Sequence, residues 1–159
     1  MIIVHDRYAK CATMNWKWLS LTALVGLVAC IVGLYLNNYA IFGAGPATIT
    51  IQVVAALLMA WARLTFGIRS FHGTANPTAG GLVTTGPYRY IRHPIYAAII
   101  YFLWAGIAAH PSLVTVAIGL LATALTAVRI VAEEKLLVTM YPEYGAYARV
   151  TKRLVPFVL

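Results

Sequence analysis

Charged side chains are scarce in this sequence, and acidic ones are the scarcest. Only 10% of the 159 residues are charged, whereas 62% are apolar. A soluble domain usually carries about 25% charged residues, so this chain has too little polar surface to cover itself in water. The net charge of +8 is a poor signal for nucleic-acid binding among so many apolar runs. Basic loops that face an anionic membrane surface explain it better.

Cysteine is also rare, and no internal repeat is present. Cys11 and Cys30 do not have the spacing of a metal site, and Cys30 lies inside an apolar run, where a buried thiol is expected. The length suits one domain, so we expect a single membrane-embedded domain over residues 1–159. Residues 1–13 are mixed and follow no pattern, and we interpret them as a dispensable extension.

Four apolar runs dominate the chain, at residues 16–36, 47–68, 94–109 and 113–131. About 20 helical residues cross the hydrocarbon core of a bilayer, so the third run is a marginal span. It is expected to form a helical hairpin with the fourth run. A signal peptide is the alternative for the first run. That run is longer than a usual signal h-region, and no clean small-x-small cleavage site follows it.

The positive charges predict the topology. All twelve Lys and Arg lie on one side of four such spans or near the span ends on that side, and the loops 37–46 and 110–112 hold none. Positive charge marks the cytoplasmic side, so both termini and the 69–92 loop are expected there. Residues 133–150 are expected to continue as an interfacial helix that Pro142 interrupts. The predicted fold class is an all-α, polytopic helical membrane protein with about four transmembrane helices.

The basic, aromatic and turn-rich stretch LVTTGPYRYIRHPIY, Leu82–Tyr96, stands out between these runs. It leads into the third apolar run, and Pro94 suits the first turn of a helix. The N-terminus of a helix favours an anion, and Arg92 adds positive charge there. His93 would cap the helix or bind a ligand. The alternative is an ordinary cluster of positive charge with a capping histidine.

Arg129 and Glu133 are four residues apart at the end of the fourth run, so a helix places them on one face. Ionisable groups at membrane depth indicate a functional site. The alternative is an arginine that extends its head to the interface beside a solvated glutamate. Glu134 strengthens the functional interpretation. Two adjacent acids oppose the usual attraction to anionic lipid, and they suggest a cationic ligand.

Seven tyrosines surround the same boundary, and either an aromatic belt or stacking on a purine ring explains them. Together, the anion site and the acid pair would suit a zwitterionic ligand with a cationic centre. S-adenosylmethionine is one such ligand, although these residues alone do not identify it. The tyrosines are Tyr88, Tyr90, Tyr96, Tyr101, Tyr141, Tyr144 and Tyr147.

The Leu82–Tyr96 stretch, then Arg129, then Glu133-Glu134, then YPEYGAYARVTKRLVPF resemble the isoprenylcysteine carboxyl methyltransferase family. These are integral membrane enzymes that use S-adenosylmethionine. The resemblance covers about residues 80–157 and implies a cofactor-binding and catalytic region there. It implies that Arg129 binds the substrate and that Arg129 and Glu133 are catalytic, and Arg92 is a second expected substrate-binding residue. The expected cofactor-binding residues are Leu82, Val83, Tyr88, His93, Pro94, Ile95, Tyr96, Glu133 and Glu134.

The sequence departs from the family pattern where the eukaryotic enzymes carry a histidine, since Gly80-Gly81 stand there. The chain also lacks their additional N-terminal spans. A lipophilic acceptor such as a prenylcysteine carboxylate is expected, and a lipid amine, a thiol or a quinone-like lipid are alternatives. Two other functions stay open at this point. They are a membrane reductase of the sterol-reductase type that uses NADPH, and a small membrane scaffold without enzymatic activity.

Overall fold

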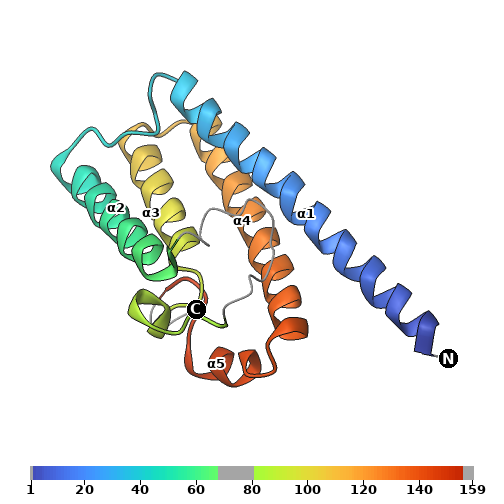
Figure 1. Cartoon of the computed structure of the whole chain (residues 1–159). Coiled ribbons are helices and arrows are strands. Elements are labelled where there is room, and N and C mark those ends of the chain that lie inside the picture. The colour runs from blue at the N-terminus through green and yellow to red at the C-terminus, as the bar shows by residue number, and fades with distance from the viewer. Residues whose placement is uncertain (1, 68–80, 156–159) are drawn as a thin grey trace.

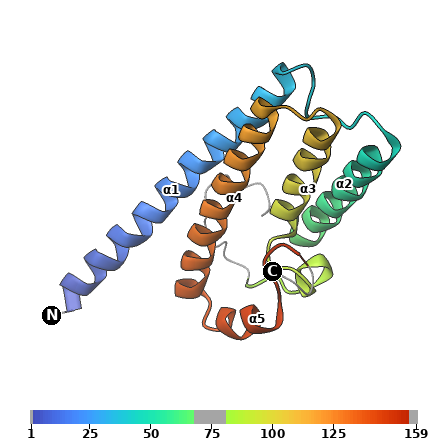
Figure 2. The same ribbon diagram turned by 180° about the vertical axis from the view of Figure 1, so that it is seen from behind.

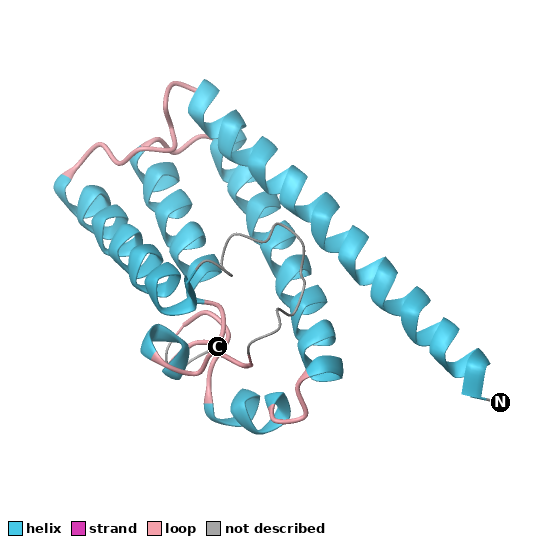
Figure 3. Cartoon of the chain, viewed as in Figure 1, coloured by secondary structure: helices cyan, strands magenta, loops and turns pink. Residues whose placement is uncertain are grey.

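The structure, a computed structural model, describes residues 2–67 and 81–155, with side chains from residue 15 onward. These residues form helices and loops and no β-strand (Figure 3), apart from an isolated parallel bridge between Ile91 and Lys152. The elements are α1 (Ile2–Leu36), α2 (Pro46–Phe66), the 3-10 helix η2 (Gly86–Arg89), α3 (Pro94–Ala109), α4 (Leu113–Met140) and α5 (Tyr144–Val150).

The four long helices stand side by side in the order α2, α3, α4, α1 (Figures 1 and 2). Helix α1 packs on α4, and α2 packs on α3. The connections 37–45 and 110–112 lie at one end of this row, and the start of α1, η2 and α5 lie at the other (Figure 1). The predicted common side for the N-terminal, middle and C-terminal basic segments is therefore present in the fold. Of the expected loop 69–92, residues 69–80 lie outside the described residues.

Three helices are long and apolar enough to cross a membrane, namely Asn15–Leu36 within α1, Pro46–Phe66 and Leu113–Met140. Helix α3 is apolar but has only 16 residues, in agreement with the marginal third span. The predicted fold class, a polytopic helical membrane protein, is confirmed.

Two helices extend further than the apolar runs. Helix α1 begins at Ile2, because the mixed N-terminal residues contain no Pro or Gly and extending a helix is easier than nucleating one. Helix α4 continues past the predicted end of the span through Glu133 to Met140. It ends there because Pro142 disfavours helix in the residue before it, and α5 begins beyond that break.

The apolar core lies where α1, α3 and α4 meet. Leu27, Cys30 and Leu34 of α1 pack with Leu103 and Ile107 of α3, and Cys30 is buried as predicted. At the same end of the bundle, a buried glutamine makes hydrogen bonds that join three segments of the chain. The Gln52 side chain of α2 donates to the carbonyls of Ile41 at 2.7 Å and Phe102 at 3.1 Å, and it accepts from the Gly43 N–H at 2.8 Å. The 37–45 loop is thereby held against α2 and α3.

Gly106→Ala is expected to lower the free energy of unfolding by about 1–3 kcal/mol, the usual cost of overpacking. A Cβ at this buried position of α3 would lie 2.5 Å from the carbonyl carbon of Ile41 and 2.7 Å from the carbonyl oxygen of Ala40. Chemical denaturation in detergent measures the change. Gly33→Ala is the matched control, because its Cβ would meet only Cδ1 of Ile118, at 3.6 Å. Equal stability of the two variants would contradict the close approach.

Candidate active site

The turn before α3 explains the glycine of the LVTTGPYRY sequence. Gly86 has a φ of +57°, in the left-handed region that glycine adopts without strain, and a Cβ there would lie 2.9 Å from Cγ2 of Thr65 on α2. Tyr88 follows within η2 and is buried, with its ring centroid 5.6 Å from that of Phe66. Burial raises the pKa of the Tyr88 phenol. The turn is therefore fastened to the end of α2.

His93 occupies the N-cap position of α3, but its side chain makes no capping hydrogen bond. The capping interpretation of His93 is therefore wrong. Its buried ring turns toward α4 instead, where Nδ1 lies 3.8 Å from Oε2 of Glu133 and Nε2 lies 3.4 Å from Oε1 of Glu134. His93 thus lies between the two adjacent acids, which the sequence separates from it by 40 residues.

Arg129, Tyr96 and Glu133 form one hydrogen-bonded group, the arginine–tyrosine–glutamate cluster. The Tyr96 hydroxyl donates to Oε1 of Glu133 and accepts from Nε of Arg129 at 2.9 Å. Nη2 of Arg129 lies 3.6 Å from the same Glu133 oxygen, and the guanidinium carbon is 5.6 Å from the Tyr96 ring centroid. Arg129 is only 4% exposed. Its charge is satisfied inside the protein, so the interpretation of an arginine that extends to the interface is wrong.

Helix α1 contributes to this cluster through its backbone. Nη1 of Arg129 donates to the carbonyl oxygen of Ser20 at 2.8 Å, and Ser20 is fully buried. Sequence reasoning missed this residue, because a backbone carbonyl has no side-chain signature and the resemblance covers only the second half of the chain. The first span is thus part of the site, although its sequence is that of a plain apolar helix.

Glu134 is the centre of a second charged group, which includes Arg92 and Arg153. Nε of Arg92 donates to Oε1 of Glu134 at 3.1 Å, and Nη2 of Arg153 donates to Oε2 at 2.8 Å. Hydrogen bonding to Glu134 raises the pKa of Arg153. Nη1 of Arg92 also donates to the carbonyls of Ala148 and Thr151, each at 2.6 Å. The expected substrate-binding Arg92 is therefore bonded to Glu134 and to the C-terminal part of the chain.

Residues 144–155, the C-terminal arm, lie against the turn before α3. The N–H groups of Arg92 and His93 donate to the carbonyls of Lys152 at 2.7 Å and Arg153 at 3.1 Å. The Tyr147 hydroxyl donates to the Tyr88 carbonyl at 2.7 Å. Burial raises the pKa of Tyr147 to about 12, so this donor keeps its proton at neutral pH. The arm and the turn form one structural unit at the end of the bundle.

The tyrosines at this end of the bundle differ in their exposure and in their contacts. Tyr88, Tyr96 and Tyr144 are buried, whereas Tyr90 is 50% exposed. The Tyr101 hydroxyl donates to the carbonyl of Leu154 at 2.9 Å. An aromatic belt therefore suits Tyr90 but not the buried tyrosines, which hold helices and the arm together.

Four of the expected cofactor-binding residues are apolar. Pro94 begins α3, as predicted, and is buried, whereas Leu82, Val83 and Ile95 are half-buried. Pro94 and Ile95 directly follow His93 and precede Tyr96, so they lie beside both acids. Leu82 and Val83 belong to the chain that enters the turn.

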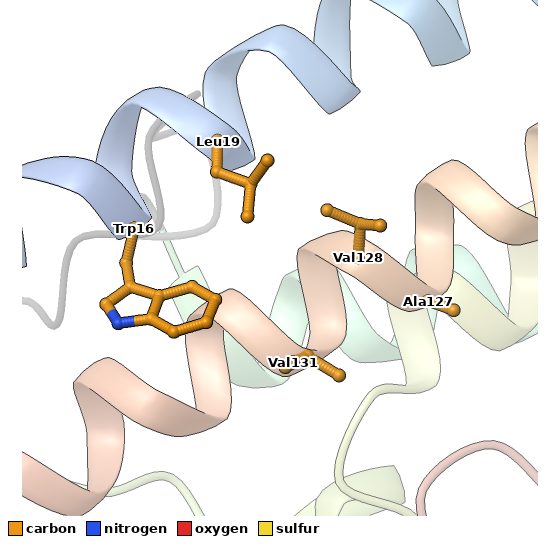
Figure 4. A pocket seen from close by; sticks show the side chains of 5 residues that line it. All are labelled: Trp16, Leu19, Ala127, Val128 and Val131. Carbon is orange, nitrogen blue, oxygen red and sulfur yellow. The ribbon is translucent and has the colours of Figure 1, made fainter.

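An apolar groove of about 250 Å³ lies between α1 and α4. Trp16 and Leu19 extend from α1 toward α4, which supplies Ala127, Val128 and Val131 (Figure 4). The groove residues are sequence neighbours of the cluster on both helices, because Leu19 precedes Ser20 and Val128 precedes Arg129. The groove and the cluster thus lie at the same height along α1 and α4, although neighbouring residues on a helix point in different directions and no member of the cluster lines the groove.

Apolar spanning helices around buried, paired charges define an integral membrane protein with a polar site at one end. The model of the isoprenylcysteine carboxyl methyltransferase family matches residues 47–139, more than half of the chain, and the chain belongs to this family. It is therefore a membrane methyltransferase. No curated protein and no solved structure matched the chain.

The boundaries of the match differ from those of the resemblance over residues 80–157. The match begins at the start of α2, contains Leu82–Tyr96, Arg129 and the two acids, and ends before the YPEYGAYARVTKRLVPF segment. The second span thus belongs to the family region, which its apolar sequence did not indicate. The dispensability of residues 1–13 stays a prediction, and so does the extent of the catalytic region.

Proposed function

We propose that this protein transfers a methyl group from S-adenosylmethionine to the carboxylate of a lipophilic acceptor, such as a prenylated cysteine. The observation that carries the proposal is the buried arginine–tyrosine–glutamate cluster, which lies at the same height along α1 and α4 as an apolar groove. A charged end and a lipid-soluble tail are the two parts of such an acceptor, and the cluster and the groove suit them respectively. The family match supports the methyltransferase, and no comparison supports the reductase or the scaffold.

The chemistry of the donor set fits S-adenosylmethionine. Glu133 would face its cationic part, since the side chain is 24% exposed and a carboxylate attracts a sulfonium or an ammonium. Tyr88, His93 and Tyr96 would supply aromatic surface for the adenosyl group. The apolar residues Leu82, Val83, Pro94 and Ile95 would line the same site. When bound, the cofactor supplies an electrophilic methyl group on a sulfonium sulfur, which keeps the electron pair as the new C–O bond forms.

Arg129 would hold the acceptor carboxylate by charge-assisted hydrogen bonds. Its Nε and Nη1 already donate to Tyr96 and Ser20, and its Nη2 lies 3.6 Å from Glu133, so the head is fixed in direction before an acceptor arrives. A carboxylate with an ordinary pKa of about 4 is ionised at neutral pH and needs no general base. Fixed orientation and exclusion of water would therefore contribute most of the acceleration.

An amine or thiol acceptor is the second candidate, and it would require a base. Glu133 is the nearest candidate for that base. Its Oε1 already accepts a hydrogen bond from Tyr96 and lies 3.6 Å from Nη2 of Arg129, whereas a carboxylate acceptor needs no base. The carboxylate acceptor is the better fit for this reason.

The proposal also places the site and both termini on the cytoplasmic side. Arg89, Lys152 and Arg153 lie at the end of the bundle where α5 and η2 meet, and the connections at the other end hold no Lys or Arg. This agrees with the positive-inside rule. Cysteine-accessibility labelling of Thr84→Cys in sealed vesicles would test the sidedness.

The decisive experiment supplies radiolabelled S-adenosylmethionine and an N-acylated prenylcysteine to the purified protein. Alkali releases labelled methanol only from a methyl ester, so the treatment separates carboxyl methylation from methylation of an amine or thiol. The matched acceptor carries a carboxamide instead of the carboxylate. We expect alkali-labile label from the acid and none from the amide. Equal labelling of both acceptors would refute the carboxylate, and tight NADPH binding without S-adenosylmethionine binding would refute the methyl donor.

A further inference from the structure

The Glu134 carboxylate receives guanidinium groups from two distant parts of the chain. Arg92 comes from the turn before α3, and Arg153 comes from the C-terminal arm, 61 residues further along. Glu134 is 14% exposed and Arg92 is 11% exposed at their side chains, whereas Arg153 is 54% exposed. Glu134 therefore binds one half-buried arginine, Arg92, and one exposed arginine, Arg153.

Arg92 connects the same acid to the end of α5. The carbonyls of Ala148 and Thr151, which accept from its Nη1, lie in the last turn of α5 and just beyond it. Helix ends leave carbonyls without partners inside the helix, and a cation there also meets the favourable end of the helix dipole. Glu134 holds Arg92 from the other side through Nε. The carboxylate therefore fixes the arginine that fastens the arm.

The arm in turn fixes the turn that carries Tyr88 and His93. The Lys152 N–H donates to the Tyr90 carbonyl at 3.3 Å, and the His93 N–H donates to the Arg153 carbonyl at 3.1 Å. Tyr147 contributes its hydrogen bond to the Tyr88 carbonyl. Each of these contacts ends on a backbone atom of the turn. Movement of the arm would therefore move the backbone that positions both aromatic side chains.

The charges around the two acids are unequal. Oε1 of Glu133 lies 3.6 Å from Nη2 of Arg129, whereas Glu134 binds the guanidinium groups of Arg92 and Arg153 at 3.1 and 2.8 Å. Two positive charges already exceed the single negative charge of Glu134. A sulfonium or an ammonium is therefore repelled by that group, whereas the Glu133–Arg129 pair is neutral and its carboxylate side chain is 24% exposed, so a cation meets less repulsion there.

We propose that Glu134 is a positioning residue, which holds the C-terminal arm on the turn 88–93 through Arg92 and Arg153 and thereby sets the affinity for the methyl donor. The inference rests on the proposed function and refines it, since Glu134 no longer serves as a direct cofactor contact. Glu133 is then the acid that faces the donor. The arm is bound to the turn 88–93 on the side of the site where the donor would bind.

The test measures donor affinity and arm mobility in the full-length protein. For Glu134→Gln we expect the KM for S-adenosylmethionine to rise about tenfold, the effect of weakening hydrogen bonds to a charged group, with kcat changed by less than about threefold. Hydrogen–deuterium exchange should become faster in residues 144–155. Arg153→Ala, at an exposed position where misfolding is not expected, should give the same pattern in weaker form. Arg153→Lys should restore the wild-type values.

Arg149→Ala is the matched control, because Arg149 is an exposed arginine of the same arm, and it should change neither readout. A loss of kcat in Glu134→Gln with unchanged exchange in the arm would overturn the proposal, because Glu134 would then act directly on the reacting groups. Unchanged KM and exchange in both variants would overturn it as well. An inactive wild-type protein would refute the proposed function, and the exchange experiment would still decide whether Glu134 fastens the arm.

Discussion

Arg129→Ala is expected to reduce methyl transfer by about thirtyfold to several thousandfold, since losing one partner of a buried, hydrogen-bonded charge pair costs about 2–5 kcal/mol. The substitution removes the group proposed to hold the acceptor carboxylate. It also leaves the Ser20 carbonyl and the Tyr96 hydroxyl without the hydrogen bonds that they receive from it. The measurement is kcat/KM for the prenylcysteine acceptor, with the KM for S-adenosylmethionine recorded separately.

Two further variants separate chemistry from folding. Arg129→Lys keeps the positive charge but cannot make the three-way contact of a guanidinium, so it should recover folding more fully than activity. Lys135→Ala removes an exposed cation from the same helix and should leave activity near wild type. Wild-type turnover in Arg129→Ala would disprove the role of this arginine in acceptor binding.

Arg92→Ala is expected to lower the free energy of unfolding by about 1.5–3 kcal/mol, the usual contribution of hydrogen bonds to a charged group. In the variant, the carbonyls of Ala148 and Thr151 would also lose the hydrogen bonds that Nη1 of Arg92 donates to both. Limited proteolysis should then cut within residues 144–155, and the same residues should resist cleavage in the wild-type protein. Denaturation in detergent gives the stability change. Arg89→Ala, an exposed arginine three residues earlier, should leave both measurements unchanged.

The same variant distinguishes two roles for Arg92. The charge pattern of the sequence predicted a substrate-binding residue, whereas the contacts of the structure favour an anchor for the arm. A substrate-binding Arg92 would raise the KM for the acceptor and leave the arm resistant to protease. An anchoring Arg92 would expose the arm whether or not an acceptor is present.

Much of the fold follows from the sequence because the physical signals are local. Apolar runs of sufficient length predict spans, and the helix end before Pro142 follows from one residue. The pairing of Arg129 with Glu133 follows from helical spacing alone. The order of the helices in the bundle does not follow from the sequence. One apolar helix face can pack on any other, and no local signal selects α4 as the neighbour of α1.

The site could be predicted only in part for the same reason. Tyr96 was expected near the cofactor, but its position between Arg129 and Glu133 depends on the packing of α3 on α4. The Arg153–Glu134 pair joins segments that no periodicity relates. His93 was expected to cap a helix or bind a ligand, and its contact with two acids arises only when α4 passes beside it. Contacts through backbone carbonyls, as at Ser20, leave no trace in a sequence.

The hydrogen bond from Arg129 to the carbonyl of Ser20 has a consequence for biosynthesis. The ribosome adds Ser20 109 residues before Arg129, so we expect the carbonyl acceptor to be in the bilayer already when this arginine enters it. An arginine at membrane depth is costly for an isolated helix, and a carbonyl acceptor that is already in the bilayer reduces that cost. We therefore expect the first span to assist insertion of the fourth, with the order of synthesis favouring assembly of the site.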